Sequence, residues 1–240
     1  MSTIRIGTSG WTYKDWRGRF YPEHLAQRDW LAYYARHFST VELNVTTYRL
    51  PKEADLARWS AVPRDFLYTV KLSRLITHRR RPGEPQAFVD NYMRAVEPLR
   101  PFIANLLAQL PPWLQRDDAA LADFLGRLPP QHRYVVEFRH PSWYCEEVYA
   151  QLRRTGAALC LHDLAGSVAP HVITSDLLYV RLHGPVRAYA GSYPGKRLLD
   201  WASRIRDLSA QVSETYVYFN NDERAFATRN ALRLRELLGV

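Results

Sequence analysis

Cysteine is scarce and long apolar runs are absent in this chain of 240 residues. Its two cysteines, Cys145 and Cys160, have neither the spacing of metal ligands nor that of a disulfide framework. No stretch approaches the roughly 18 consecutive apolar residues that a membrane-spanning helix needs. A strand-like segment begins at Ile4, where a secretory signal would be expected. We therefore predict a cytoplasmic protein with two buried thiols and no membrane association.

The chain also lacks a lysine-rich tail, a low-complexity segment, an internal repeat and a break between domains. We therefore expect residues 1–240 to form one domain. The net charge is +9, spread along the chain, and the isoelectric point is about 9.7. Such a charge favours anionic partners, such as nucleic acid or phosphorylated metabolites. A basic surface without a dedicated partner is the alternative interpretation.

Strand-like and helix-like segments alternate from one end of the chain to the other. The expected strands are residues 4–9, 40–45, 66–72, 103–110, 134–139, 157–163, 177–183 and 215–220. Amphipathic segments with helical spacing lie at residues 27–38, 52–61, 86–99, 117–128, 145–155, 197–211 and 223–238. This alternation predicts an α/β fold, a single TIM-like (β/α)8 barrel. Residues 165–176 are mostly loop-like, so we expect a short or missing helix between the sixth and seventh strands.

A doubly wound sheet is the alternative fold. It would usually have a glycine-rich phosphate turn and a helix directly after the first strand. The corresponding segment here is GTSGWTYKDW (7–16), and no helical pattern follows it. The sequence therefore favours the barrel.

Polar side chains collect on one face of the expected strands. In YVVEFR (134–139), Glu137 and Arg139 alternate with Val136 and Phe138, so the two charged residues share a face. The same alternation groups Glu42 with Asn44, Thr69 with Lys71, Arg181 with Tyr179 and His183, and Asn220 with Tyr216 and Tyr218. The opposite faces are apolar and suited to packing against helices.

Active sites of such barrels lie at the C-terminal ends of the strands, so these polar faces would meet in the upper barrel interior. The interior would then hold one surplus positive charge, since its charged residues are Glu42, Lys71, Glu137, Arg139 and Arg181. Leaving one such buried charge unpaired would cost about 3–5 kcal/mol. Two interpretations stay open: a purely architectural ion network, or an anion-binding pocket. The pocket is favoured by residues that packing does not require, namely Gln109, His183 and Asn220.

Motifs along nearly the whole chain carry a resemblance to a known family. They are IGTSGWTYKDWRGRFYP (6–22), YYARHFSTVELNVTTYRLP (33–51), VKLSRLITH (70–78), QLPP (109–112), EFRHPSW (137–143), YVRLHGP (179–185), AYAGSY (188–193) and YFNND (218–222), followed by RNALRLREL (229–237). In this order they resemble the DUF72, or YecE-like, family. The resemblance implies a TIM-like barrel and no established activity. The family usually has a glycine turn near the last motif, where this chain has Ala225 and Phe226.

The strand ends suggest hydrolysis of a phosphoester as a hypothesis. Glu42 or Glu137 would act as general base, and Asp163 would orient a neighbouring group. His140 precedes Pro141 and suits either hydrogen bonding in a loop or acid–base chemistry. The residues expected to neutralise the anion are Lys71, Arg139 and Arg181.

Aromatic side chains are expected at the same end of the barrel. Beside arginine they could stack on bases or sugars, or they could form an apolar lid. The loop THRRRP (77–82) could hold phosphates or be a solvated charged loop. A non-catalytic nucleic-acid-binding protein is therefore the first alternative. The complete set of predicted ligand-binding residues is Trp11, Asn44, Tyr48, Lys71, Gln109, Arg139, Arg181, His183, Tyr189, Tyr193 and Asn220.

A metal-dependent sugar isomerase or hydrolase is the second alternative. Carboxylates and imidazoles at the strand ends could hold a divalent metal, and the residues concerned are Glu42, Glu137, His162, Asp163 and His183. Lys71, Arg139 and Arg181 would crowd the same space and repel a cation. We therefore predict no cofactor and no metal ligand, with a divalent metal as the alternative.

Overall fold

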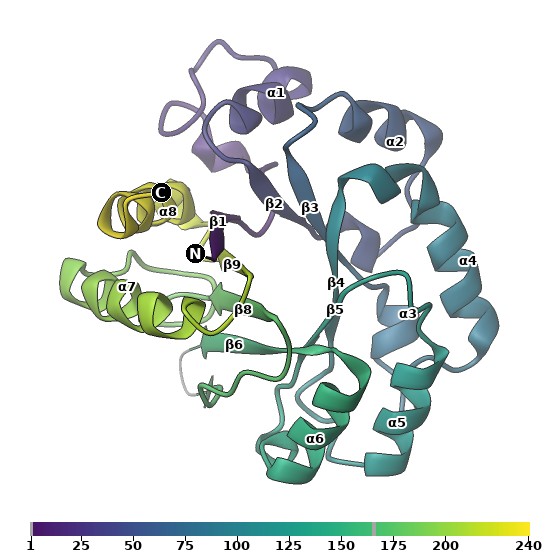
Figure 1. Ribbon diagram of the computed structural model, residues 1–240. Helices are drawn as coiled ribbons and strands as arrows, with labels where there is room; N and C mark the ends of the chain where they lie inside the picture. Colours follow the sequence, from purple (N-terminus) through teal and green to yellow (C-terminus); the bar gives the residue numbers. More distant parts are fainter. Residues whose placement is uncertain (1, 165–166) are drawn as a thin grey trace.

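Eight parallel strands form a ring at the centre of the protein (Figure 1). This computed structural model describes residues 2–164 and 167–240. The strands of the ring are β1 (Thr3–Thr8), β2 (Thr40–Leu43), β3 (Leu67–Lys71), β4 (Ile103–Gln109), β5 (Tyr134–Glu137), β6 (Ala158–Leu164), β8 (Leu177–Leu182) and β9 (Glu214–Phe219). Their order is β1-β9-β8-β6-β5-β4-β3-β2. The predicted TIM-like barrel is therefore confirmed.

The ring is nearly closed, and its seam lies between β1 and β2. At the seam, the Tyr34 hydroxyl accepts a hydrogen bond from Thr8 N (2.9 Å) and donates one to Thr40 O (3.2 Å). Gly7 permits this close approach, because a Cβ there would lie 2.2 Å from Thr40 O. A side-chain hydroxyl therefore bridges the seam, and the backbones bond directly only at its end, where Gly10 N donates to Glu42 O at 2.9 Å.

Helices surround the ring (Figure 1). They are α1 (Trp30–Ala35), α2 (Glu53–Ser60), α3 (Arg74–Thr77), α4 (Gln86–Val96), α5 (Asp118–Arg127), α6 (Glu146–Thr155), α7 (Gly195–Ser209) and α8 (Phe226–Leu238). Each expected helical segment overlaps one of these helices, and α7 begins two residues before its expected segment. Side chains cap the first turn of two helices. Asp117 accepts from Ala120 N at the start of α5, and Ser73 accepts from Leu75 N at the start of α3. Helix α3 has no counterpart among the expected helical segments. No helix among the described residues has the length and apolar character needed to cross a membrane.

The connection between β6 and β8 differs from the others. A short strand, β7 (Ser167–Val168), pairs antiparallel with β6. The described residues of this connection contain no helix, which confirms the predicted missing helix. Residues 165–166, at the start of the predicted loop, lie outside the described residues.

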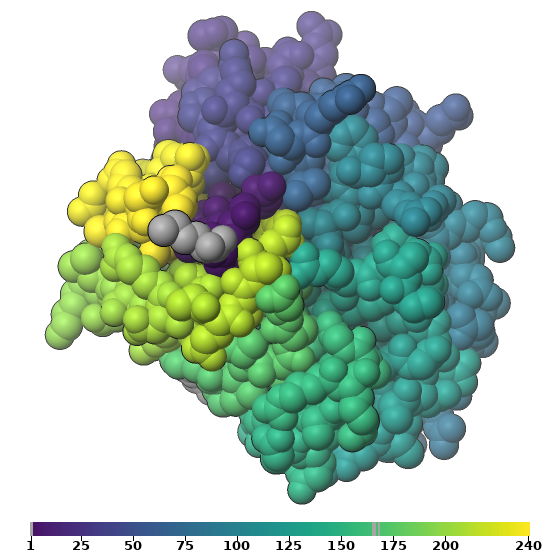
Figure 2. Space-filling model, in the orientation of Figure 1, coloured from purple at the N-terminus to yellow at the C-terminus, as the bar shows by residue number. Residues whose placement is uncertain are grey.

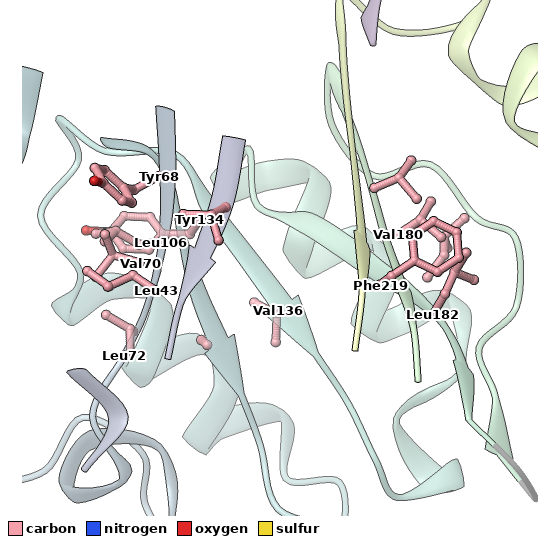
Figure 3. Packing of buried hydrophobic residues seen from close by; sticks show 14 of the residues in the cluster. Leu43, Tyr68, Val70, Leu72, Leu106, Tyr134, Val136, Val180, Leu182 and Phe219 are labelled. Carbon is pink, nitrogen blue, oxygen red and sulfur yellow. The ribbon is translucent and has the colours of Figure 1, made fainter. Parts of the chain in front are cut away.

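The strand faces separate apolar from polar side chains. The apolar faces turn outward into the core beneath the helices, and Figure 3 shows part of this core, including Leu43, Val70, Val136, Val180 and Phe219. Inside the ring, a second apolar layer fills the barrel with Leu107, Val135, Ala158, Cys160, Leu177, Tyr179, Tyr216 and Tyr218. The predicted assignment of faces is therefore confirmed for these strands.

The two cysteines have different environments. Cys160 is fully buried inside the barrel, and burial raises the pKa of its thiol. Cys145 is half-buried and precedes α6. Both are free thiols. The prediction of two buried thiols is right for Cys160 and wrong for Cys145, because the start of α6 leaves Cys145 partly accessible.

The two ends of the chain meet on one side of the barrel. Strand β1 pairs along its full length with β9, and α8 packs against both β1 and α7. In Figure 2 the yellow atoms of α8 lie directly against the yellow-green atoms of α7, close to the purple N-terminal segment. The last helix therefore covers the first strand.

The loop between β9 and α8 has an unusual backbone. Arg224 and Ala225 are both left-handed, with φ of 54° and 57°. This conformation costs a residue with a Cβ roughly 1–2 kcal/mol, whereas glycine adopts it readily. The turn is held from the segment after β1, since Asp15 Oδ2 accepts from Arg224 N (2.7 Å) and Trp16 Nε1 donates to Asp222 O (2.8 Å). The chain thus keeps a left-handed turn here without glycine.

We expect Ala225→Gly to raise the free energy of unfolding, measured by urea denaturation, by about 0.5–1 kcal/mol, because it removes the left-handed strain. Ala202→Gly, at a buried position within α7, is the matched control and should lower it by about 1 kcal/mol. Equal destabilisation by both substitutions would contradict the strain at Ala225.

Candidate functional site at the barrel mouth

Arg181, on β8, lies at the centre of the upper barrel interior and is 1% exposed. Its Nε donates to both carboxylate oxygens of Glu42, at 2.8 and 2.9 Å. Its Nη1 donates to Glu137 Oε2 at 2.5 Å and to Gln109 Oε1 at 3.3 Å. Its Nη2 donates to Ser9 Oγ at 3.2 Å. One guanidinium therefore joins β2, β4, β5 and the end of β1 to β8.

Glu137 carries a second set of charged contacts. Its Oε1 lies 2.5 Å from Arg139 Nη2 and 3.3 Å from His183 Nε2. Burial alone would raise the pKa of this carboxyl group. Arg139, Arg181 and His183 together hold the pKa well below its ordinary value of 4.5. Glu137 is therefore ionised at neutral pH and lies within ion-pair distance of both arginines.

Two histidines beside this network are uncharged at neutral pH. Burial and the nearby Arg181 lower the pKa of His183 to about 3, and burial lowers that of His162 to about 4. The neutral His183 ring lies between two N–H donors, since its Nε2 is 3.1 Å from Arg139 Nη2 and its Nδ1 is 3.1 Å from Asn220 Nδ2. The net charge of the interior is therefore set by the carboxylates, the two arginines and Lys71.

Lys71, at the end of β3, carries the surplus positive charge. Its Nζ donates to an amide oxygen, Gln109 Oε1, at 2.8 Å. No carboxylate among the described residues forms an ion pair with it, because arginines engage both buried glutamates. Burial and the nearby Arg181 lower the pKa of Lys71 to about 8. The amine is therefore mostly protonated at neutral pH, half-buried and without an ion-pair partner among the residues that the structure describes.

A cavity of about 270 Å³ opens at the barrel mouth beside this amine. Tyr48 and Tyr189 flank it and are 75% and 47% exposed. The predicted ligand-binding residues that line it together are Asn44, Tyr48, Lys71, Gln109, Arg181, Tyr189 and Asn220. Glu42 and Glu137 are fully buried and do not line it, so neither faces a ligand there.

Asp222 lines the same cavity and was missed from the sequence. Burial raises its pKa to about 7, and Glu42 contributes in the same direction, while Tyr13 and Arg181 oppose the shift. One of its oxygens, Oδ1, is buried and has no hydrogen-bond partner among the described residues. The signal in the sequence was its position directly after the polar end of β9, in the family motif YFNND.

Several predicted residues lie elsewhere. Asp163 points out of the barrel, where it accepts from Arg197 Nη2 (2.7 and 2.9 Å) and Trp201 Nε1 (3.2 Å), both on α7. It therefore ties α7 to β6 and does not orient a group at the mouth. The period-two alternation explains this, because His162 takes the inward position, in register with Arg181.

Other expected members of the site have structural contacts. His140 Nδ1 accepts from Ser142 N at 3.2 Å and caps the turn Pro141–Trp143. Tyr193 is 3% exposed, and its hydroxyl accepts from Gly184 N. Trp11 lines a neighbouring cavity instead of the mouth. Arg139 and His183 act on the mouth through Glu137 and Asn220, because neither lines the cavity.

No group of three His, Cys, Asp or Glu side chains within residues 2–164 and 167–240 is arranged to hold a metal ion. The residues of the metal alternative are separated by their contacts: Glu42 and Glu137 bind Arg181, while Asp163 faces α7. The structure therefore offers no support for the metal alternative.

Comparison with known proteins identifies the family. The family model described as "Protein of unknown function DUF72" matches residues 5–240. The chain belongs to the DUF72 family. Two curated proteins similar to this DUF72 chain are UPF0759 protein YunF of Bacillus subtilis and UPF0759 protein YecE of Escherichia coli. YunF is 26% identical over 99% of this chain and 95% of its own length. YecE is 33% identical over 60% of this chain and 51% of its own length.

Solved structures agree with the DUF72 barrel. A DUF72 family protein from Thermotoga maritima is 32% identical, with a TM-score of 0.90 over 99% of this chain and 100% of that one. A second, from Enterococcus faecalis, is 19% identical with a TM-score of 0.85 over 99% and 96% of the two chains, and shows the fold alone. These descriptions give a family and a fold, so function must be argued from the geometry of the mouth.

We expect Arg181→Gln to lower the free energy of unfolding by about 3–5 kcal/mol, because it leaves two buried carboxylates without their cation. Arg153→Gln is the control: it removes an exposed pair with Glu146 and should cost less than about 1 kcal/mol. Urea denaturation measures both.

The loss of unfolding free energy in Arg181→Gln should also depend on pH. Without Arg181, the pKa of Glu137 rises, so the folded variant takes up a proton where the wild type stays ionised. The difference from the wild type should therefore shrink as pH falls from about 8 to about 5. A deficit independent of pH would contradict this account of the network.

Proposed function

We propose that the mouth cavity binds an anionic, phosphate-bearing ligand such as a nucleotide, a nucleic-acid strand or a sugar phosphate. The observation that carries the proposal is the charge on Lys71. The amine contacts the amide of Gln109 and has no carboxylate partner among the described residues. A buried or half-buried charge without a counter-ion is costly, and a bound anion would supply that counter-ion.

Neutral donors around the cavity support the same ligand. Gln109 Oε1 accepts from both Lys71 and Arg181, which leaves the amide NH₂ of Gln109 as a donor. Asn220 and Thr47 also line the cavity. The cations and amides together suit a phosphate group, which has several acceptor oxygens.

Hydrolysis of a phosphoester is the reaction we propose first. Glu42 and Glu137, the general bases expected from the sequence, are fully buried and held by arginines. Asp222 is better placed, because it lines the cavity and has a pKa raised to about 7 by burial. It would give its proton to the leaving oxygen as the ester P–O bond breaks. Water would form the new P–O bond and release the proton that restores Asp222.

Non-catalytic binding of nucleic acid is the alternative, and one observation favours it. An open cleft of about 660 Å³ is lined by Arg79, Arg80, Arg81 and Arg127. Two of these, Arg81 and Arg127, pair with Glu84, so part of the charge is already balanced. The remaining guanidinium groups could bind a phosphate backbone. The two free thiols agree with a cytoplasmic location, which we propose for either function.

We expect Lys71→Met to weaken sulfate binding, measured by calorimetry, by about tenfold or more, because it removes the cation without a counter-ion. Wild-type affinity should fall as pH rises through about 8, where Lys71 loses its proton, and sulfate itself does not titrate there. In the variant the fall near pH 8 should disappear, and only the effect of Asp222, which ionises near pH 7 in the same cavity, should remain. Lys196→Met, an exposed position on α7, is the control and should bind like the wild type.

Unchanged affinity in Lys71→Met would overturn the mouth as the anion site. The dependence of binding on salt concentration then distinguishes the arginine cleft from the mouth cavity. Binding of an oligonucleotide to the open arginine cleft should fall steeply with ionic strength, while sulfate at the half-buried Lys71 should be less sensitive.

We expect Asp222→Asn to lower kcat for phenyl phosphate by about a hundredfold or more. The wild-type rate should fall above about pH 7 as Asp222 loses its proton, and the variant should lack this limb. Asp207→Asn, which removes an exposed carboxylate on α7 outside the cavity, is the control. Sulfate binding without any hydrolysis in the wild type would leave the anion site standing and remove the catalytic role.

A further inference from the structure

A second cavity, of about 340 Å³, lies beside the barrel mouth. Tyr13 and Asn44 line both this cavity and the mouth, so these two side chains form the boundary between them. The volume lies in the range of small-molecule sites. A ligand bound at Lys71 would therefore have a second space directly next to it.

One side of this second cavity is apolar, and the other is polar. Trp11, Leu31, Leu43 and Trp59 present buried side chains to it, and Val45 is half-buried at its edge. Two of these are indole rings, which provide flat surfaces for a planar group. The chemistry of this apolar side thus differs from that of the mouth, where cations and amides predominate.

Its polar side is held in place by an ion-pair cluster. Asp55 accepts from Arg49 Nη1 at 2.6 Å, from Arg58 Nη2 at 3.2 Å and from Lys52 N at 3.0 Å. These contacts use both oxygens of the carboxylate. The cluster therefore fixes one wall, and the two arginines offset the charge of Asp55.

The boundary itself has an unused acceptor. Asn44 Nδ2 donates to Ser9 Oγ at 2.8 Å, which fixes the orientation of the amide. Its Oδ1 is buried and has no hydrogen-bond partner among the described residues. A buried amide oxygen without a partner is destabilising, and a donor on a ligand at this boundary would satisfy it.

We propose that the second cavity binds a planar apolar group of the same ligand whose anionic group lies at Lys71. The ligand class is then an aryl or heteroaryl phosphate with a donor between its two ends, a class that includes nucleotides. This inference rests on the proposed anion site. It separates such ligands from simple sugar phosphates, which would leave the apolar walls uncovered.

Two phosphonates of equal charge test the proposal by calorimetry, because neither can be hydrolysed at a P–O ester bond. Phenylphosphonate has the planar group and methylphosphonate does not. We expect the wild type to bind phenylphosphonate on the order of 10- to 100-fold more tightly, from burial of the ring. Equal affinities would overturn the second subsite while leaving the anion site intact.

Substitutions that fill the cavity locate the effect. Val45→Phe, from the edge of the cavity, and Leu31→Phe, from α1, should each bring the ratio of the two affinities close to one. Leu199→Phe, exposed on α7, is the matched control and should keep the wild-type ratio. A substitution that merely weakens the anion site would lower both affinities equally and leave their ratio unchanged. An unchanged ratio in Val45→Phe and Leu31→Phe, with both variants folded, would therefore overturn the proposal. Failure of both phosphonates to bind the wild type would instead remove the anion site itself.

Discussion

The contact of Arg181 with Glu42 and Glu137 is the constraint on which the barrel mouth depends. Its partners come from different strands, so the guanidinium is satisfied only when those strands are in register. Apolar packing fills the rest of the ring, but packing alone is less selective about register than a buried ion pair. The same contact engages both carboxylates. As a result, Lys71 is left with an uncompensated charge at the cavity surface.

Much of the fold was predictable because apolar residues alternate on the strands and recur at helical spacing between them. The limits were physical as well. Helix α3 has four residues, too few for a periodic signal. The seam could not be foreseen, because the Tyr34 hydroxyl belongs to a helix and meets β1 and β2 only in three dimensions. The contacts of the Tyr34 hydroxyl with β1 and β2 join residues far apart in the chain and leave no local pattern in the sequence.

The site was predictable where it follows the strands and unpredictable beyond them. The alternation placed Glu137 and Arg181 correctly inside the barrel, because side-chain direction follows from position. The same rule, applied to His162 and Asp163, gives the outward direction of Asp163 that the structure shows. Asp222 lies past the end of β9, where no periodic rule fixes direction. It lines the cavity directly before the left-handed turn at Arg224 and Ala225.

The seam has a further consequence for how the ring is held together. Between β1 and β9 the chain has its two ends, so no covalent link joins them, but the backbone ladder is complete. Between β1 and β2 the Tyr34 hydroxyl bridges the strands, one backbone hydrogen bond joins Gly10 to Glu42 at their ends, and a continuous stretch of chain connects them. The edge of β1 without a direct chain connection and the edge without a full backbone ladder therefore lie on opposite sides of the strand. Strand β1 is therefore held mainly by backbone hydrogen bonds at one edge and by the chain connection at the other. Each pair of neighbouring strands in the ring has a backbone ladder, a direct chain connection, or both.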